Sequence, residues 1–379
     1  MLGRSFPIAR IAGVRVEVHP SWLLILAFLS WSLSDQFFPD QYEGWSTATY
    51  WAVGISAAVL LFVTVLVHEF AHALVAIRRG LPVPKITLFI FGGVSSLGQQ
   101  PRSAGEEFAI AAAGPATSFV IAAVTGVAGL AVSGSNDQAE AILYYLAGVN
   151  VALGVFNLLP GFPLDGGRVL RSIAWKSTGS FRRATCIASS VGELFSYVLI
   201  GGGFLLALSG MVVQGLWFVF IGWFLHGAAR GERQGIQLET VLAGLFARDL
   251  MDETFPAVAP GLPIQTLVDD YMLGEGHRAV MVANDGGVLG ILSVNDVRRV
   301  PRSEWPTTPV QRVMTPREGL VSVDAGTAAF DVFVLVSKKG LNQVPVLADG
   351  RMVGLITRRH LLDRIQLAES LEPDEPADA

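Results

Sequence analysis

The chain has 379 residues and a net charge of −5; 51% of its residues are hydrophobic and only 16% are charged. Soluble globular proteins carry about 25% charged residues, so this composition excludes an ordinary soluble protein. There is no basic stripe of the kind that binds nucleic acid, and the single cysteine, Cys186, excludes an intramolecular disulfide.

The shortage of charge is confined to residues 1–230, which contain long apolar runs. A helix that crosses a bilayer needs about 20 mostly apolar residues. The segments that we expect to span the membrane are 20–36, 51–77, 107–133, 141–160, 185–209 and 211–229. The first of them lacks a small-residue cleavage pattern, so we expect it to stay in the protein as a membrane helix.

The positions of lysine and arginine predict how these helices are oriented. Arginine, in places together with lysine, occurs in 1–19, 78–106, 161–184 and from 230 onward, whereas the loops near 37–50, 134–140 and 210 contain neither residue type. Short cytoplasmic loops carry the excess of lysine and arginine in membrane proteins. We therefore expect the N-terminus and the whole C-terminal region to lie in the cytoplasm.

Residues 84–99 differ from the spanning segments. They are too short to cross a membrane and are rich in β-branched and aromatic residues around Gly92-Gly93, which favours a β-hairpin. Irregular backbone at membrane depth is tolerated only where protein or water satisfies its polar groups. A hairpin that enters the membrane from the cytoplasmic side and a plain surface loop are both open interpretations.

The second apolar segment contains the motif His68-Glu69-x-x-His72. Residues four apart share one face of a helix, so both imidazoles can bind one metal ion, with Glu69 beside them to hold a water molecule. An ionisable side chain at membrane depth costs at least ~2.5–3.5 kcal/mol. Three such groups together therefore indicate a functional site rather than packing.

A catalytic zinc site normally has a third protein ligand. Asp165 is the only acidic residue between Glu140 and Glu193, and it follows the Pro-broken end of the fourth apolar segment. The predicted topology puts this end and the His68–His72 turn in the same half of the membrane, so Asp165 can complete the site. The alternative is a plain turn residue in Leu-Asp-Gly-Gly.

The soluble part repeats itself, because residues 277–296 match residues 341–360 at constant offset. Asp285 pairs with Asp349, Gly290 with Gly354 and Ser293 with Thr357. Each copy predicts a strand, a turn, a second strand and a helix, and two copies indicate a paired, pseudo-symmetric domain. The expected organisation is a membrane domain at 1–230, a linker at 231–245, a paired domain at 246–366 with repeats at about 246–300 and 310–366, and a disordered acidic tail at 367–379.

Taken together, the two membrane motifs resemble the site-2 protease family of intramembrane zinc metalloproteases. That family carries His-Glu-x-x-His on one membrane helix and Asn-x-x-Pro-x-x-Pro-Leu-Asp-Gly on another, which residues 157–166 match in full. Gly92-Gly93 and Gly114-Pro115 resemble two further family segments. The C-terminal repeats resemble a tandem cystathionine-β-synthase (CBS) domain pair, the appendage of one bacterial and archaeal branch of the family.

The resemblance implies a multi-pass α-helical membrane protein with about six transmembrane helices and a membrane-associated β-hairpin, followed by a soluble α/β tandem CBS domain. It implies that His68, His72 and Asp165 bind one zinc ion per chain and that Glu69 is the general base and acid. Asn150 and Asn157 would contact the substrate or the oxyanion. Hydrogen bonding between helices is the alternative role for both asparagines.

The expected activity is hydrolysis of peptide bonds inside the bilayer of a bacterial cell membrane. The substrate that the family implies is a single-pass transmembrane protein, such as a membrane-tethered regulator. One rival interpretation is a CBS-gated transporter or channel, which predicts polar residues along several helices, whereas here they concentrate at 68–72 and 150–165. The other is an inactive relative that only binds membrane partners, although neither Glu69 nor a metal ligand has been lost.

The CBS resemblance also implies an adenine nucleotide in a cleft between the repeats, held by the Asp of a Ser/Thr-x-x-Asp segment. The first repeat supplies Ser293-Val-Asn-Asp296, but the second has His360 in place of the acid. A neutral imidazole offers one acceptor where a carboxylate offers two oxygens, so we expect at most one good site, at Asp296. The alternative is a module that only forms a homodimer or holds the protease rigidly.

Overall fold

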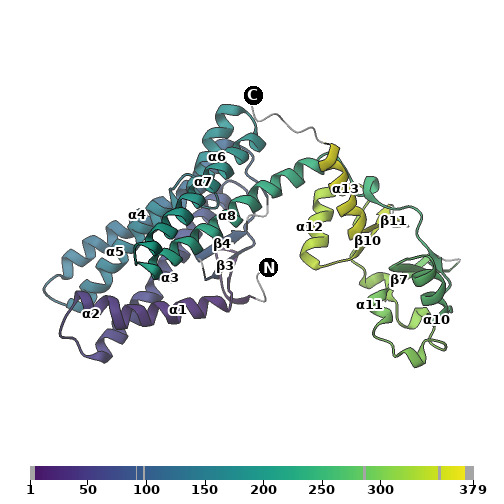
Figure 1. The fold of residues 1–379 in the computed structure, drawn as a ribbon, viewed down its shortest axis with the longest axis horizontal. Coiled ribbons are helices and arrows are strands. Elements are labelled where there is room, and N and C mark those ends of the chain that lie inside the picture. Colours follow the sequence, from purple (N-terminus) through teal and green to yellow (C-terminus); the bar gives the residue numbers. More distant parts are fainter. Residues whose placement is uncertain (1–4, 91, 97–98, 285–286, 349–350, 372–379) are drawn as a thin grey trace. The chain divides into compact units, whose positions relative to one another are not determined.

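The computed structural model describes residues 5–90, 92–96, 99–284, 287–348 and 351–371 (Figure 1). The chain divides into two compact units between Ile236 and Gln237. Helix α8 (Val212–Val241) runs through this point, so the first part of the expected linker at 231–245 is helical. The domain limits drawn from the sequence stay predictions.

Within the described residues, six helical segments are long and apolar enough to cross a membrane, which confirms the expected number. They are Ser21–Gln41, α3 (Thr47–Arg78), α4 (Ala104–Val132), α5 (Asp137–Asn157), α7 (Phe181–Leu208) and α8. The first consists of α1 (Ser21–Ser32), a continuing helical stretch at 33–37 and α2 (Phe38–Gln41). In the first unit α3 packs against α1, α4 and α5, and α4 packs against α5 (Figure 1).

Glycines allow the last two of these helices to approach closely. A Cβ built at Gly203 of α7 would lie 2.6 Å from the carbonyl oxygen of Gly215 on α8. Where two membrane helices cross, small residues let their backbones come into van der Waals contact. Any larger side chain at Gly203 would therefore push α7 and α8 apart.

The expected hairpin at 84–99 is present as β3 (Lys85–Phe89) and β4 (Gly92–Ser96), which pair antiparallel. It belongs to a four-stranded sheet of order β1-β2-β3-β4 that also contains β1 (Phe6–Ile11) and β2 (Val14–Val18). The parallel pairing of β2 with β3 is reinforced by a 2.8 Å ion pair between Glu17 and Lys85. Hydrogen bonds from Lys85 and Ser5 lower the pKa of Glu17. Strand β4 forms one edge of the sheet.

A short amphipathic helix, α6 (Asp165–Thr178), lies between the fourth and fifth spanning helices and packs against α4 and α7. Its first residue is Asp165. Gly166 and Gly167 follow, and a Cβ at either position would overlap the backbone of residues 158–162. The two glycines thus let the chain after α5 fold back tightly and start α6 at the aspartate.

The second unit contains two sheets, of order β5-β6-β7-β8 and β11-β10-β9. The elements of its first half are α9 (Ala247–Leu250), β5 (Ala257–Val258), α10 (Ile264–Thr266) continued as helix to 274, β6 (Ala279–Asn284), β7 (Gly287–Ser293), α11 (Val294–Val297) and β8 (Thr315–Pro316). Those of its second half are β9 (Val323–Asp324), α12 (Ala329–Lys339), β10 (Gln343–Ala348), β11 (Arg351–Thr357) and α13 (Arg358–Leu371). Helix α13 therefore extends into the segment that was expected to be a disordered tail.

Both repeats have the expected strand–strand–helix order, as β6–β7–α11 and β10–β11–α13. The predicted turn aspartates, Asp285 and Asp349, lie outside the described residues. The segment that precedes each repeat joins the sheet of the other repeat. Asp252 pairs with Leu355, and Thr315 pairs with Ile291. This exchange makes the two repeats one paired domain.

Candidate metal centre

Three side chains from two separate parts of the membrane unit converge on one point. Nε2 of His68 and Nε2 of His72 lie 3.2 and 3.1 Å from Oδ2 of Asp165, and 3.3 Å from each other. Zinc forms bonds of about 2.0–2.1 Å in tetrahedral sites, which separates neighbouring ligand atoms by about 3.3 Å. The spacing and the donor types therefore fit a zinc ion.

Both imidazole rings are oriented by α4. Nδ1 of His72 donates a hydrogen bond of 2.6 Å to the carbonyl oxygen of Ile110, and Nδ1 of His68 lies 2.8 Å from the hydroxyl of Ser118. Because a carbonyl can only accept, Nδ1 of His72 carries a proton, and Nε2 is the ring nitrogen that can bind a metal. Such partners behind metal-binding histidines fix the tautomer and the direction of the ring.

Gly114 of α4 keeps the space beside the two rings open. A Cβ built there would overlap Nε2 of His72 and lie 2.6 Å from Nε2 of His68. The histidines are 3% and 4% exposed, and the Asp165 side chain is 14% exposed. The ligand atoms thus surround a nearly closed space in which only glycine fits at position 114.

Glu69 is half-buried on α3, next to His68, and β4 passes directly over it. A Cβ built at Gly93 would lie 2.9 Å from Cδ and 3.2 Å from Oε1 of Glu69. Glycine at this position therefore lets the edge strand of the sheet reach the carboxylate without displacing it. This contact gives a physical reason for Gly93, which the sequence singled out as part of a hairpin and of a family-like segment.

The two asparagines differ in their surroundings. Asn150 is fully buried, and its Nδ2 donates to Thr64 on α3 at 3.2 Å and to the carbonyl of Leu146 at 2.8 Å. Its Oδ1 has no hydrogen-bond partner among the described residues. Asn157 is half-buried at the end of α5. The Nδ2 bond to Thr64 is an interhelical hydrogen bond, which agrees with one of the two interpretations of Asn150.

A pair of histidines on a helix long enough to cross a membrane, with a carboxylate at the start of α6 beside them, is the kind of group that holds a metal in a membrane metalloprotein. The model of Peptidase family M50 matches residues 56–137 and 126–199, and the CBS domain model matches 247–303 and 310–367. The chain is 35% identical to a relative named zinc metalloprotease Rip3 from Mycobacterium tuberculosis, over 98% of this chain and 95% of the relative. It is 33% identical to a relative named zinc metalloprotease sll0528 from Synechocystis, over 96% of each chain.

Among solved structures, the site-2 protease from Methanocaldococcus jannaschii matches with 27% identity and a TM-score of 0.41, over 61% of this chain and 95% of that chain. The chain belongs to Peptidase family M50, the site-2 proteases, and carries a tandem CBS pair. It is a multi-pass membrane zinc metalloprotease, as expected from the sequence. The roles of the individual site residues stay predictions.

Proposed function

We propose that the chain cuts single-pass transmembrane proteins within their membrane segments, with zinc held by His68, His72 and Asp165. The observation that supports this most directly is the convergence of three ligand atoms, from two buried histidines and a half-buried aspartate, within 3.3 Å of one another beside Glu69. A membrane-tethered regulator is the substrate class that we expect.

Zinc in such a site makes water nucleophilic at neutral pH and polarises the scissile carbonyl. Glu69 accepts the proton of the attacking water and then gives it to the leaving amine. An amide N–H of Asn157 or Asn150 donates to the oxyanion that develops on the carbonyl oxygen. For Asn150 this requires Nδ2 to leave Thr64, so Asn157 is the better candidate.

A helical substrate hides its peptide bonds and has to unwind before it can be cut. An extended peptide can add to an exposed sheet edge through main-chain hydrogen bonds. Strand β4 is an edge strand in contact with Glu69 through Gly93. We therefore expect the unwound segment to pair with β4, which would bring its backbone to the carboxylate.

The experiment that tests this function is cleavage of a model transmembrane peptide by the purified full-length chain in detergent. We expect one zinc ion per chain, loss of cleavage when a chelator removes the metal, and recovery when zinc is returned. Cleavage at the full rate by metal-free protein would contradict the proposal. A zinc-loaded chain that cuts no transmembrane peptide would favour the inactive-relative interpretation.

We place the CBS module and the N-terminus in the cytoplasm, because lysine and arginine occur only on that side of the membrane helices in the short loops. Protease added to sealed spheroplasts should leave the module intact, whereas protease added to inverted vesicles should release it. Release from spheroplasts would reverse the orientation.

The geometry around Asp296 bears on the proposed nucleotide site. Oδ2 of Asp296 accepts hydrogen bonds from the backbone N–H of Ser293 at 2.9 Å and from its hydroxyl at 2.6 Å. Oδ1 lies 3.5 Å from Arg299, and the residue is 7% exposed. Only Oδ1 is thus available to a ribose hydroxyl unless the cap of α11 opens.

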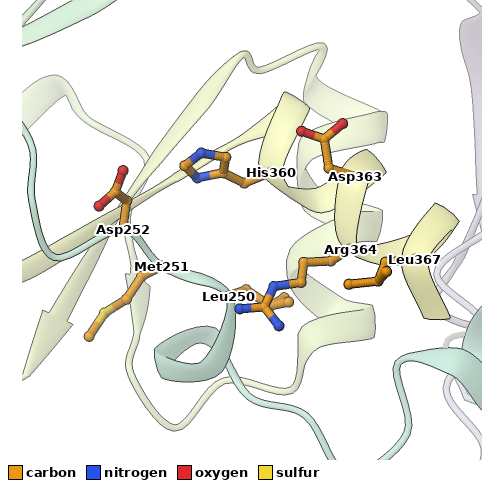
Figure 2. A pocket seen from close by; sticks show the side chains of 7 residues that line it. All are labelled: Leu250, Met251, Asp252, His360, Asp363, Arg364 and Leu367. Atoms are coloured by element: carbon orange, nitrogen blue, oxygen red, sulfur yellow. The ribbon is translucent and has the colours of Figure 1, made fainter.

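The second repeat offers a different site. A pocket of about 320 Å³ is lined by Leu250, Met251, Asp252, His360, Asp363, Arg364 and Leu367 (Figure 2). His360 and Asp252 face each other across it, and Arg364 projects into it from α13 (Figure 2). The pocket contains His360, which replaces the ribose-binding acid in the second repeat. It is therefore a second candidate site for a nucleotide.

Calorimetry with ATP, ADP and AMP on the full-length chain distinguishes these sites. We expect binding that Asp296→Ala abolishes and His360→Ala leaves intact, because a carboxylate accepts from ribose hydroxyls better than an imidazole does. Loss of binding in His360→Ala alone would move the site to the pocket. No heat from any nucleotide at millimolar concentration would leave the module as a scaffold or a dimerisation domain.

A further inference from the structure

Helix α4 presents four buried residues on one face: Glu107, Ile110, Gly114 and Ser118. Their spacings of three and four residues place them in one row along the helix. Ile110 and Ser118 form hydrogen bonds with the two histidines, through a carbonyl oxygen and a hydroxyl. Gly114 leaves open the space beside the two Nε2 atoms. Glu107 belongs to the same row but does not touch either ring, and it is fully buried.

The partner of Glu107 is Arg171 on α6, the helix that begins with Asp165. Oε1 of Glu107 accepts a hydrogen bond of 2.7 Å from Nε of Arg171 and a second one from its Nη2. Arg171 is only 7% exposed. This buried ion pair therefore joins the helix that orients the two histidines to the helix that carries the aspartate.

Two aromatic rings also lie against the guanidinium. The rings of Phe162 and Phe181 lie 4.8 and 4.6 Å from its central carbon. Phe162 belongs to the segment that leads into Asp165, and Phe181 is the first residue of α7. Because a guanidinium is planar and donates through a rigid fork, stacking and pairing together fix both its position and its orientation.

Chemistry gives a reason why this pair is present. A buried charge is tolerated only when it is paired, and an apolar pair of similar size would often be as stable. Apolar side chains could therefore fill the space between α4 and α6 as well as a charged pair does. A charged pair also fixes how the two helices align, because its hydrogen bonds form at one register and are lost when either helix slides or turns.

We propose that Glu107 and Arg171 are positioning residues for Asp165. They fix α6 against the same face of α4 that orients His68 and His72, and so set the distance between the carboxylate and the two Nε2 atoms. Arg171 follows Asp165 by six residues, which is about 9 Å along a helix, so a shift at one end of this stiff segment reaches the other. The inference rests on the proposed zinc site and extends it.

The test measures zinc affinity of the full-length chain in detergent, by competition with a chromophoric chelator. Glu107→Gln and Arg171→Gln should each weaken zinc binding by about 10–100-fold, the usual effect of residues that orient metal ligands. The absorption spectrum of the cobalt-substituted protein should change in both variants. The matched control is Arg168→Gln, which removes the same charge from the same helix three residues nearer to Asp165; it should change neither quantity.

A double-mutant cycle separates positioning from general stability. If Arg171 acts through Asp165, then Arg171→Gln should weaken zinc binding by no more than about 2-fold in an Asp165→Ala background, because the two effects are coupled. The same 10–100-fold loss in both backgrounds would overturn the inference, as would normal affinity in Arg171→Gln alone. Unchanged affinity in Asp165→Ala alone would instead refute the zinc site itself.

A second variant covers the case in which Arg171→Gln does not fold. Arg171→Lys keeps the charge opposite Glu107 but loses the planar group that contacts the two phenylalanine rings. We expect a folded protein with a smaller loss of zinc affinity and a changed cobalt spectrum. Wild-type affinity together with a wild-type spectrum would show that the precise geometry of the pair does not set the position of Asp165.

Discussion

Glu69→Gln should lower the rate of transmembrane peptide cleavage by at least ~10²-fold, the low end of what a general base contributes. Glutamine keeps the size and the hydrogen bonding of glutamate, so it still fits beneath Gly93, where the contact with Cδ is tight. It cannot accept a proton from water. Zinc should stay bound, because the converging ligand atoms belong to His68, His72 and Asp165.

The measurement compares cleavage rate and zinc content in the same sample. Glu43→Gln is the matched control, since Glu43 is an exposed glutamate in the loop before α3, and this variant should cleave at the wild-type rate. Near-normal cleavage by Glu69→Gln would remove Glu69 from the chemistry. Loss of zinc from Glu69→Gln would mean that the substitution had disturbed the metal ligands. A lower cleavage rate could then not be attributed to loss of a base.

The parts of the fold and the site that depend on residues close together in the sequence could be predicted from the sequence. The six spans follow from runs of apolar residues, and the His68-x-x-x-His72 pair follows from helix periodicity alone. Asp165 could be proposed because it is the only acid in a long stretch, but two readings stayed open. In the structure Asp165 follows a tight turn and starts α6, and its Oδ2 lies 3.2 Å from Nε2 of His68, so its position is compatible with both readings.

Long-range pairing was not predictable in the same way. Strands β1 and β2 lie in a basic segment that had been interpreted only as a topology signal, and β2 pairs with β3 about seventy residues later. Arg171 had likewise been counted among the charges at the cytoplasmic edge. It is instead buried against Glu107, 64 residues away. No local pattern distinguishes an arginine in such a pair from one that faces solvent.

Asp165→Ala should weaken zinc binding by more than ~10²-fold, because even residues that only orient a metal ligand cost 10–100-fold. The two imidazoles would remain, each still held by α4 through Ile110 and Ser118. Two ligands are fewer than a catalytic zinc site uses, so cleavage should be lost together with the metal. Zinc content and cleavage rate, measured as zinc is titrated in, test both effects.

Asp137→Ala is the matched control for this variant. Asp137 is the exposed first residue of α5, as Asp165 is the first residue of α6. Both substitutions therefore remove a carboxylate that interacts favourably with a helix N-terminus, but only one removes a ligand. Asp137→Ala should retain one zinc ion and full activity. If Asp165→Ala did the same, Asp165 would be a turn residue that starts a helix, and the third ligand would have to be sought elsewhere.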